Sequence, residues 1–303
     1  MSHLRAESAL RNRLLLVAAA LLFSTGGAVF KAASITAWQT ASFRSGVAAL
    51  VLLAAFPEAR RWRWNMLPVA AAYAATLILF VLANRLTTSA NAIFLQSTSP
   101  IYVLLLGPLL LREPIRRADL YYIVAVAAGL VLFFAGRDTV AATATDPPRG
   151  NLLALASGVT YALMLVGMRW HGREGGQGSG IAIPALGNLI AFAAALPMAL
   201  PVESFTARDA IVILYLGVAQ IGLAYWCLTR AIRQVPAFEA TTTLQLEPAM
   251  SPVWSWLAHG ERPTPWALAG GVLIVSATLA NTWFGRRRDQ RKQAARAMME
   301  SRG

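Results

Sequence analysis

Three charged residues, Arg44, Glu239 and Glu247, lie inside long apolar stretches of this sequence. An ionisable group deep in a bilayer costs at least about 2.5 kcal/mol on insertion scales, because no water is there to solvate it. Such a group must face a partner or a polar cavity. We therefore interpret these three side chains as candidates for ligand binding or proton transfer.

Two of the apolar stretches share one design, in which a run of polar residues leads to a proline. A proline removes one backbone donor and disturbs the preceding helical turn, so Pro100 and Pro248 are predicted hinges. The candidate ligand-binding side chains of the two runs are Asn91, Gln96 and Thr98 before Pro100, and Glu239, Thr242 and Gln245 before Pro248. A structural alternative stays open, in which the prolines bend the helices for packing and the hydroxyls bond the freed carbonyls.

Glu247 and Arg44 each allow several roles. Glu247 directly precedes Pro248, and it could carry a coupled proton, form an ion pair with Arg44 or Lys31, or cap the backbone break without titrating. Arg44 could attract the carboxylate of a ligand, snorkel to the membrane interface or pair with an acidic residue. The two residues are thus predicted to serve either in coupling or in a structural ion pair.

Aromatic and thioether side chains near these positions suit an apolar ligand. Most aromatic residues of membrane proteins form packing contacts or interface belts, so the better candidates lie away from the ends of the apolar stretches. The pocket candidates of this kind are Tyr73, Phe80, Phe94, Tyr161, Met164 and Tyr225. Thr25 joins them because it lies in a dense run of small residues within the first apolar stretch.

The elements that must position these residues are membrane helices. The chain is 57% hydrophobic and 14% charged, whereas an average soluble domain is about half apolar and a quarter charged. We count ten apolar stretches long enough to cross a bilayer, between residues 14 and 284. The first thirty residues resemble a signal peptide, but the apolar stretches that follow favour an uncleaved first helix. The predicted fold is therefore an all-α polytopic membrane protein.

The positive charges predict the orientation. The net charge of +13 does not indicate nucleic-acid binding, because the basic residues lie between and after the apolar stretches. Most of the 27 lysines and arginines fall on one side if both termini are cytoplasmic, as cation-rich cytoplasmic loops require. Five helices in each half is an odd number, so the second half must enter from the opposite side.

The two halves also match each other in sequence. The shift that places Pro100 on Pro248 also places Glu113 on Glu261. We expect a first five-helix repeat at 12–136, a second, inverted repeat at 150–285 and a basic cytoplasmic tail at 286–303. Inverted repeats with interrupted helices are typical of secondary transporters, which bind their cargo where the repeats meet.

Motifs for other chemistry are absent from the sequence. It contains no Walker glycine loop and no His-Glu-x-x-His zinc motif, and Ser255 with His259 does not make a hydrolase constellation. Cys227 is the only cysteine, so no internal disulfide is possible. We expect no catalytic residues, no metal and no cofactor.

Several of these features together resemble the EamA-type drug/metabolite transporters. They are the five-plus-five helix count, Arg44 in the second apolar stretch, and the acidic-proline turns Leu-Arg-Glu-Pro at 111–114 and Gly-Glu-Arg-Pro at 260–263. The resemblance implies a ten-helix carrier of the inner membrane that works by alternating access. It also implies export of amino acids, and the aromatic candidates are most similar to the branch that exports aromatic and neutral amino acids.

The expected function is therefore export of an amino acid or a similar small metabolite, by a lipid-embedded chain that binds no nucleic acid. Protons are the candidate coupling ion, and a monomer suffices for such a fold. A drug or nucleotide-sugar carrier is the alternative within the class. A membrane enzyme or a passive channel is the remote alternative; an enzyme would turn over its substrate, and a channel would show neither saturation nor counterflow.

Overall fold

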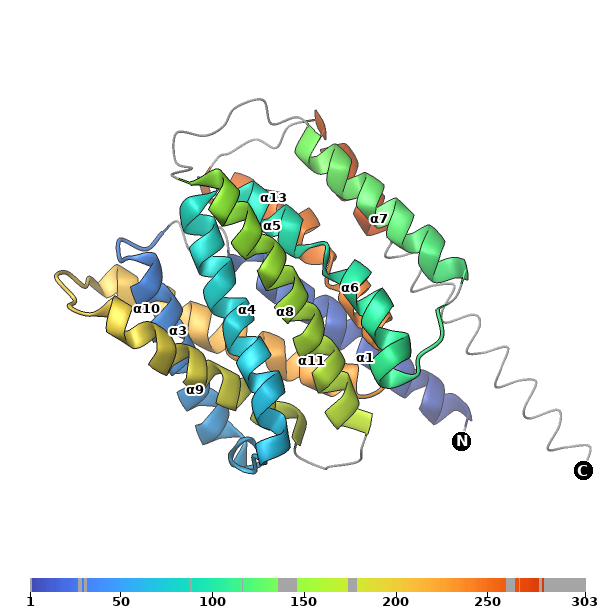
Figure 1. Ribbon diagram of the computed structural model, residues 1–303, viewed down its shortest axis with the longest axis horizontal. Coiled ribbons are helices and arrows are strands. Elements are labelled where there is room, and N and C mark those ends of the chain that lie inside the picture. The colour runs from blue at the N-terminus through green and yellow to red at the C-terminus, as the bar shows by residue number, and fades with distance from the viewer. Residues whose placement is uncertain are drawn as a thin grey trace, which may run out of the picture.

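A computed structural model describes residues 2–26, 29, 32–87, 89–115, 117–135, 146–173, 179–259, 265–266, 268–277 and 280. Across these residues the chain is helical, with no strand, and its helices are joined by short connections (Figure 1). Four helical segments are long and apolar enough by themselves to cross a membrane, at Trp64–Asn84, Pro147–Arg173, Gly180–Ala199 and Ala207–Ile232. The predicted class, an all-α polytopic membrane protein, is confirmed.

The first half contains five spans, of which the fourth is divided. Short 3-10 turns, η1 (Pro57–Arg60) and η2 (Trp64–Met66), connect the second span to the third. The spans are α1 (Ser2–Ser24), α3 (Ala37–Ala55), α4 (Leu67–Leu86), the series α5 (Ser89–Gln96), α6 (Ser99–Leu106) and η3 (Gly107–Leu111), and α7 (Arg117–Ala135).

The second half repeats this order, and its third and fourth spans are divided. Its spans are α8 (Pro147–Arg173), α9 (Ser179–Ala199), the series α10 (Ala207–Tyr215), η4 (Leu216–Leu223) and α11 (Ala224–Ile232), the pair α12 (Ala237–Thr243) and α13 (Leu246–His259), and a last helix of which Leu268–Ala277 is described. Both η3 and η4 are π-helical.

The fourth and ninth spans break next to the two prolines named above. Pro100 lies in the first turn of α6 and Pro248 in the first turn of α13, where a missing N–H leaves no helical bond unmade. Tighter i to i−3 bonds close the breaks, from Thr98 N to Leu95 O at 3.3 Å and from Gln245 N to Thr242 O at 3.1 Å. Polar backbone is thereby turned toward the interior of the bundle at two related places.

The two halves run in opposite directions through the molecule. In Figure 1 the N-terminus and the end of α8 lie at the lower right, whereas α8 begins at the upper left. The first span of the second half thus starts at the end of the bundle opposite to that at which the first half starts.

One end of the bundle, which we call the cation-rich end, gathers the helix termini that carry most of the described arginines. Contacts between these termini define it, since His171 reaches Asn65 O, Arg173 reaches Leu111 O and Arg169 reaches the carbonyls of 232 and 233. Its arginines include Arg13, Arg60, Arg61, Arg63, Arg112, Arg169, Arg173, Arg230 and Arg233.

Helices of the two halves interlock through close packing. α4 lies along α8, and α3 lies along α9. A Cβ on Gly187 of α9 would lie 2.6 Å from Cδ1 of Tyr73 on α4, so only glycine permits this approach. The result is one continuous interior in which side chains of both halves meet.

Candidate functional site

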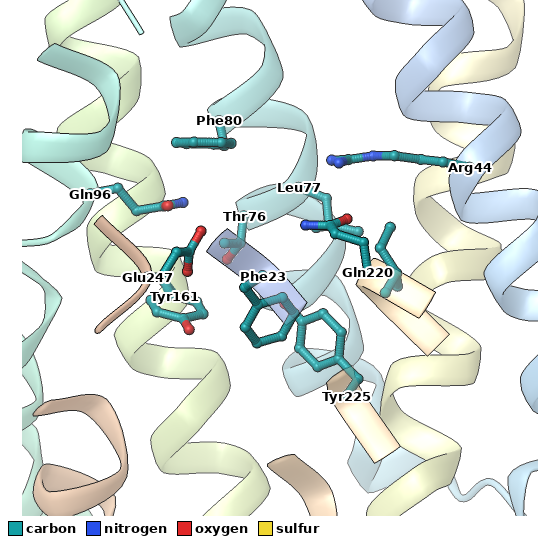
Figure 2. A pocket seen from close by; sticks show the side chains of 11 residues that line it. Phe23, Arg44, Thr76, Leu77, Phe80, Gln96, Tyr161, Gln220, Tyr225 and Glu247 are labelled. Atoms are coloured by element: carbon teal, nitrogen blue, oxygen red, sulfur yellow. The ribbon is translucent and has the colours of Figure 1, made fainter. Parts of the chain in front are cut away.

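A pocket inside the bundle is lined by side chains from both halves (Figure 2). It contains about 470 Å³ of space not filled by atoms, counting the part open to solvent. The lining residues are Phe23, Arg44, Thr76, Leu77, Phe80, Gln96, Tyr161, Gln220, Ile221, Tyr225 and Glu247. Six of the candidates named from the sequence are among them: Arg44, Phe80, Gln96, Tyr161, Tyr225 and Glu247.

The two charged groups of the pocket stand on opposite walls. Figure 2 shows Glu247 beside Gln96 and Tyr161, with Arg44 across the pocket from them. Arg44 comes from α3 and is only 4% exposed, and Glu247 lies in the first turn of α13, where the helix dipole stabilises negative charge. The Arg44–Glu247 ion pair considered from the sequence is not formed in this conformation, because the two helices approach the pocket from different sides. Lys31, the other partner considered, lies outside the described residues.

Two amides complete the polar lining. Gln96 of α5 is fixed by donating Nε2–H to Ser157 Oγ at 2.7 Å. Gln220 lies in the π-helical segment η4, and its Oε1 is buried with no hydrogen-bond partner among the described atoms. An unsatisfied buried acceptor costs about 1–3 kcal/mol, so this oxygen marks a place where a bound donor would be favourable.

Aromatic rings form the apolar wall. The ring centroids of Phe23 and Tyr225 lie 4.9 Å apart in an edge-to-face arrangement, and those of Tyr73 and Tyr225 lie 4.5 Å apart. Tyr73 does not line the pocket itself. It stands behind Tyr225, and its hydroxyl accepts a hydrogen bond from Asn188 Nδ2 at 2.7 Å.

A layer of buried side chains on α8 lies between the pocket and the cation-rich end. Along α8 the pocket residue Tyr161 is followed by Met164 and Met168, which are 0% and 1% exposed, before Arg169 is reached. Met164 therefore belongs to this layer and not to the lining, with its sulfur 4.0 Å from the Tyr225 hydroxyl.

Beyond that layer, ion pairs join the halves. Glu113 accepts from Arg169 Nε at 2.9 Å and from the N–H of Ala237 at 3.1 Å. Arg13 of α1 donates from Nε to Oε1 of Glu239 at 2.7 Å. Glu239, expected from the sequence to contact a ligand, is thus held in an ion pair and is not among the pocket-lining residues.

The remaining hydroxyl and amide candidates bond protein carbonyls. Thr25 donates to Leu22 O at 2.7 Å, Thr98 to Leu95 O at 2.6 Å and Thr242 to Phe238 O at 2.9 Å. Gln245 donates to Ser97 O at 2.9 Å, which ties the two helix breaks together. None of these four lines the pocket. The side chains of Asn91 and Phe94 lie outside those that the structure describes.

Five lining residues were not among the pocket candidates: Phe23, Thr76, Leu77, Gln220 and Ile221. Gln220 had a usable signal, since it is the one amide within the apolar run from Val212 to Trp226. Leu77 and Ile221 had none, because an apolar residue in an apolar helix does not reveal which way it faces.

The overall arrangement, two oppositely directed helical halves around a pocket lined by both, is that of a membrane transporter. The EamA-like transporter family model matches residues 12–135 and 148–283. The chain belongs to this family, and it is a multi-pass membrane transporter and not an enzyme.

Named relatives extend over most of the chain. The chain is 29% identical over 277 residues to the pseudopaline exporter CntI of Pseudomonas aeruginosa (strain UCBPP-PA14), covering 88% of this chain and 94% of that protein. It is 28% identical over 223 residues to the threonine/homoserine exporter RhtA of Salmonella typhimurium (strain SL1344), covering 71% and 70%.

A solved crystal structure shares the fold. It superposes with a TM-score of 0.75 at 17% identity and covers 91% of this chain and 98% of its own. At that identity the likeness concerns the fold alone.

Proposed function

We propose that this chain is a secondary transporter that exports amino acids or similar small metabolites by alternating access. The observation that carries the proposal is the pocket lined by both halves, polar on two walls and aromatic between them. Transporters built from inverted halves bind cargo at such a place and expose it to one side at a time. The relatives' names support the direction, since both denote exporters.

The cargo class follows from the pocket and from one relative. Threonine and homoserine, named for the second relative, are neutral amino acids. The aromatic wall made by Phe23, Phe80, Tyr161 and Tyr225 favours an aromatic or neutral side chain on the cargo. A drug or a nucleotide sugar is the alternative cargo within the same fold.

The orientation follows from the cation-rich end. Cytoplasmic loops carry the excess of lysine and arginine, so this end faces the cytoplasm and both termini lie inside, in the bacterial inner membrane. The ion pairs Glu113–Arg169 and Arg13–Glu239 then join the halves on the cytoplasmic side in this conformation. Export requires that they separate in the other state, and Pro100 and Pro248 supply the helix breaks at which the halves bend.

Purified protein in liposomes tests the proposal. Vesicles loaded with unlabelled phenylalanine, leucine or threonine should accumulate the labelled form transiently by counterflow, and uptake should saturate. Empty liposomes are the control. Linear, unsaturable flux without counterflow would indicate a channel, and absence of flux for all three amino acids would overturn the cargo assignment.

Proton coupling is tested at Glu247, the carboxyl group of the pocket. If Glu247 carries the coupled proton, an imposed pH gradient drives uptake in the wild type, and Glu247→Gln abolishes that dependence while counterflow persists. A pH-gradient dependence that is unchanged in Glu247→Gln removes this role.

A further inference from the structure

The pocket contains one positive and one negative side chain on separate walls, with apolar surface between them. Figure 2 shows the guanidinium of Arg44 on one side and the carboxylate of Glu247 on the other, with Phe23 and Tyr225 lying below and between them. Opposite charges that are held apart in a low-dielectric interior favour a ligand that carries the complementary charges at its two ends.

Charge balance narrows the ligand class. A carboxylate on the cargo is favourable beside Arg44, and a fixed like charge close to Glu247 is costly. A phosphate diester would bring negative charge without a cation for Glu247. A simple organic amine would complement Glu247 but brings no carboxylate to the Arg44 side of the pocket. A cargo with one anionic and one cationic group complements both walls.

The unsatisfied amide adds an independent observation. Gln220 Oε1 is buried in the pocket lining and accepts no hydrogen bond from the described atoms, and the Gln220 side chain is 9% exposed. An acceptor of this kind requires an N–H or O–H donor from a ligand. Glu247 requires the same, whereas Arg44 offers only donors.

We propose that Arg44 binds the carboxylate and Glu247 the ammonium group of a zwitterionic cargo, with Gln220 accepting a hydrogen bond from that cargo. Arg44 and Glu247 are then the residues that determine specificity, because they distinguish an amino acid from its decarboxylated and deaminated analogues. This inference rests on the proposed function, and it names the two groups that the transported molecule must carry.

Competition with analogues that carry only one of the two charged groups tests the inference on the wild-type protein. Counterflow of labelled L-phenylalanine is measured without a pH gradient, against unlabelled phenethylamine, which lacks the carboxylate, and 3-phenylpropionate, which lacks the ammonium. Each analogue should compete at least roughly tenfold more weakly than L-phenylalanine, since each loses a charge-assisted contact. Labelled leucine and threonine are tested in parallel.

Variants then test whether the carboxylate of the cargo binds Arg44 and its ammonium group binds Glu247. Arg44→Gln should lose most of its preference for phenylalanine over phenethylamine, while its preference over 3-phenylpropionate persists. Glu247→Gln should show the reverse pattern. Arg44→Lys and Glu247→Asp keep the charge and should keep the wild-type order of competition. Arg61→Gln and Glu58→Gln make the same chemical changes at exposed loop positions and should change neither preference.

The outcomes distinguish failure of the zwitterion inference from failure of the proposed transport function. Counterflow of amino acids in which both analogues compete as well as phenylalanine would overturn the zwitterion inference and leave the transporter proposal standing. Failure of every amino acid in folded wild-type protein would overturn both. If Arg44→Gln does not fold, the wild-type competition and the Arg44→Lys variant still decide the question.

Discussion

Arg169 donates from Nε to Oε1 of Glu113 across 2.9 Å, and this ion pair joins the end of the fourth span to the end of the sixth. The second carboxylate oxygen of Glu113 accepts the N–H of Ala237, where the ninth span begins. Three spans from both halves therefore depend on one carboxylate at the cation-rich end. In the proposed alternating access these contacts break whenever the cation-rich end opens.

Loss of the Glu113 carboxylate should favour opening of the cation-rich end. A hydrogen bond to a charged group contributes about 1.5–3 kcal/mol, so Glu113→Gln should raise the open population on the order of tenfold. Cys227, the only cysteine, is 4% exposed in the interior and reports the opening through its rate of modification by a maleimide. Glu58→Gln is the matched control. Equal modification rates in wild type and Glu113→Gln would show that this ion pair does not hold the end closed.

The opposite end depends on a different carboxylate. Asp209 accepts from the N–H of Ser34 at 2.7 Å, from its hydroxyl at 2.8 Å, and from the N–H and hydroxyl of Thr206 at 2.9 and 2.6 Å. Asp209→Asn replaces one acceptor oxygen by a donor that faces other donors. We expect a loss of about 1.5–3 kcal/mol of unfolding free energy, seen as a lower thermal midpoint in detergent.

Glu203→Gln serves as the control for Asp209, since Glu203 lies at the same end of the bundle and is exposed. A thermal midpoint of Asp209→Asn that equals those of the wild type and Glu203→Gln would mean that these four bonds contribute nothing net.

Close packing of Gly187 on Tyr73 makes a stability prediction. An alanine Cβ at 187 would lie 2.6 Å from the Tyr73 ring, and the hydroxyl of Tyr73 is held by Asn188. Overpacking of this kind costs about 1–3 kcal/mol, so Gly187→Ala should lower the thermal midpoint. Gly107→Ala is the control, because a Cβ there meets nothing within 4 Å. Equal losses from both substitutions would contradict the packing argument.

The aromatic wall makes a prediction about cargo preference. Tyr161→Ala should weaken competition by phenylalanine more than competition by threonine, because an aromatic pair contributes about 0.5–1.5 kcal/mol beyond the area it buries. The change in the ratio of half-inhibitory concentrations should be about two- to tenfold. Tyr215→Ala, outside the pocket, is the control. An unchanged ratio in Tyr161→Ala would remove the aromatic wall from the account of specificity.

The sequence alone predicted how deep a residue lies in the membrane better than it predicted which way its side chain faces. Charged and aromatic residues far from the ends of apolar stretches, such as Arg44 and Tyr161, do line the pocket, because an interior polar group needs a cavity or a partner. The helix breaks beside Pro100 and Pro248 also followed from the missing N–H of proline. These inferences needed only the local sequence and its position within a span.

The local sequence could not predict the roles of residues whose partners come from distant segments. Glu239 has the same sequence context as a pocket residue, and its ion pair with Arg13 depends on the approach of α1 to α12. Threonine hydroxyls such as that of Thr98 donate to nearby backbone carbonyls of their own segment and are therefore not offered to a ligand. Nothing in the sequence distinguishes such a threonine from one that faces the pocket. Gln220 faces the pocket from the π-helical segment η4, a feature that the sequence pattern did not predict.

The central claim is that the two halves must separate at the cation-rich end for transport to occur. In a Cys227→Ser background, Arg13→Cys and Glu239→Cys place thiols on the two sides of the observed ion pair, where a short bifunctional reagent can join them. We expect the cross-link to stop amino-acid counterflow and its cleavage to restore counterflow. Counterflow at the same rate in the cross-linked and uncross-linked protein would contradict the claim.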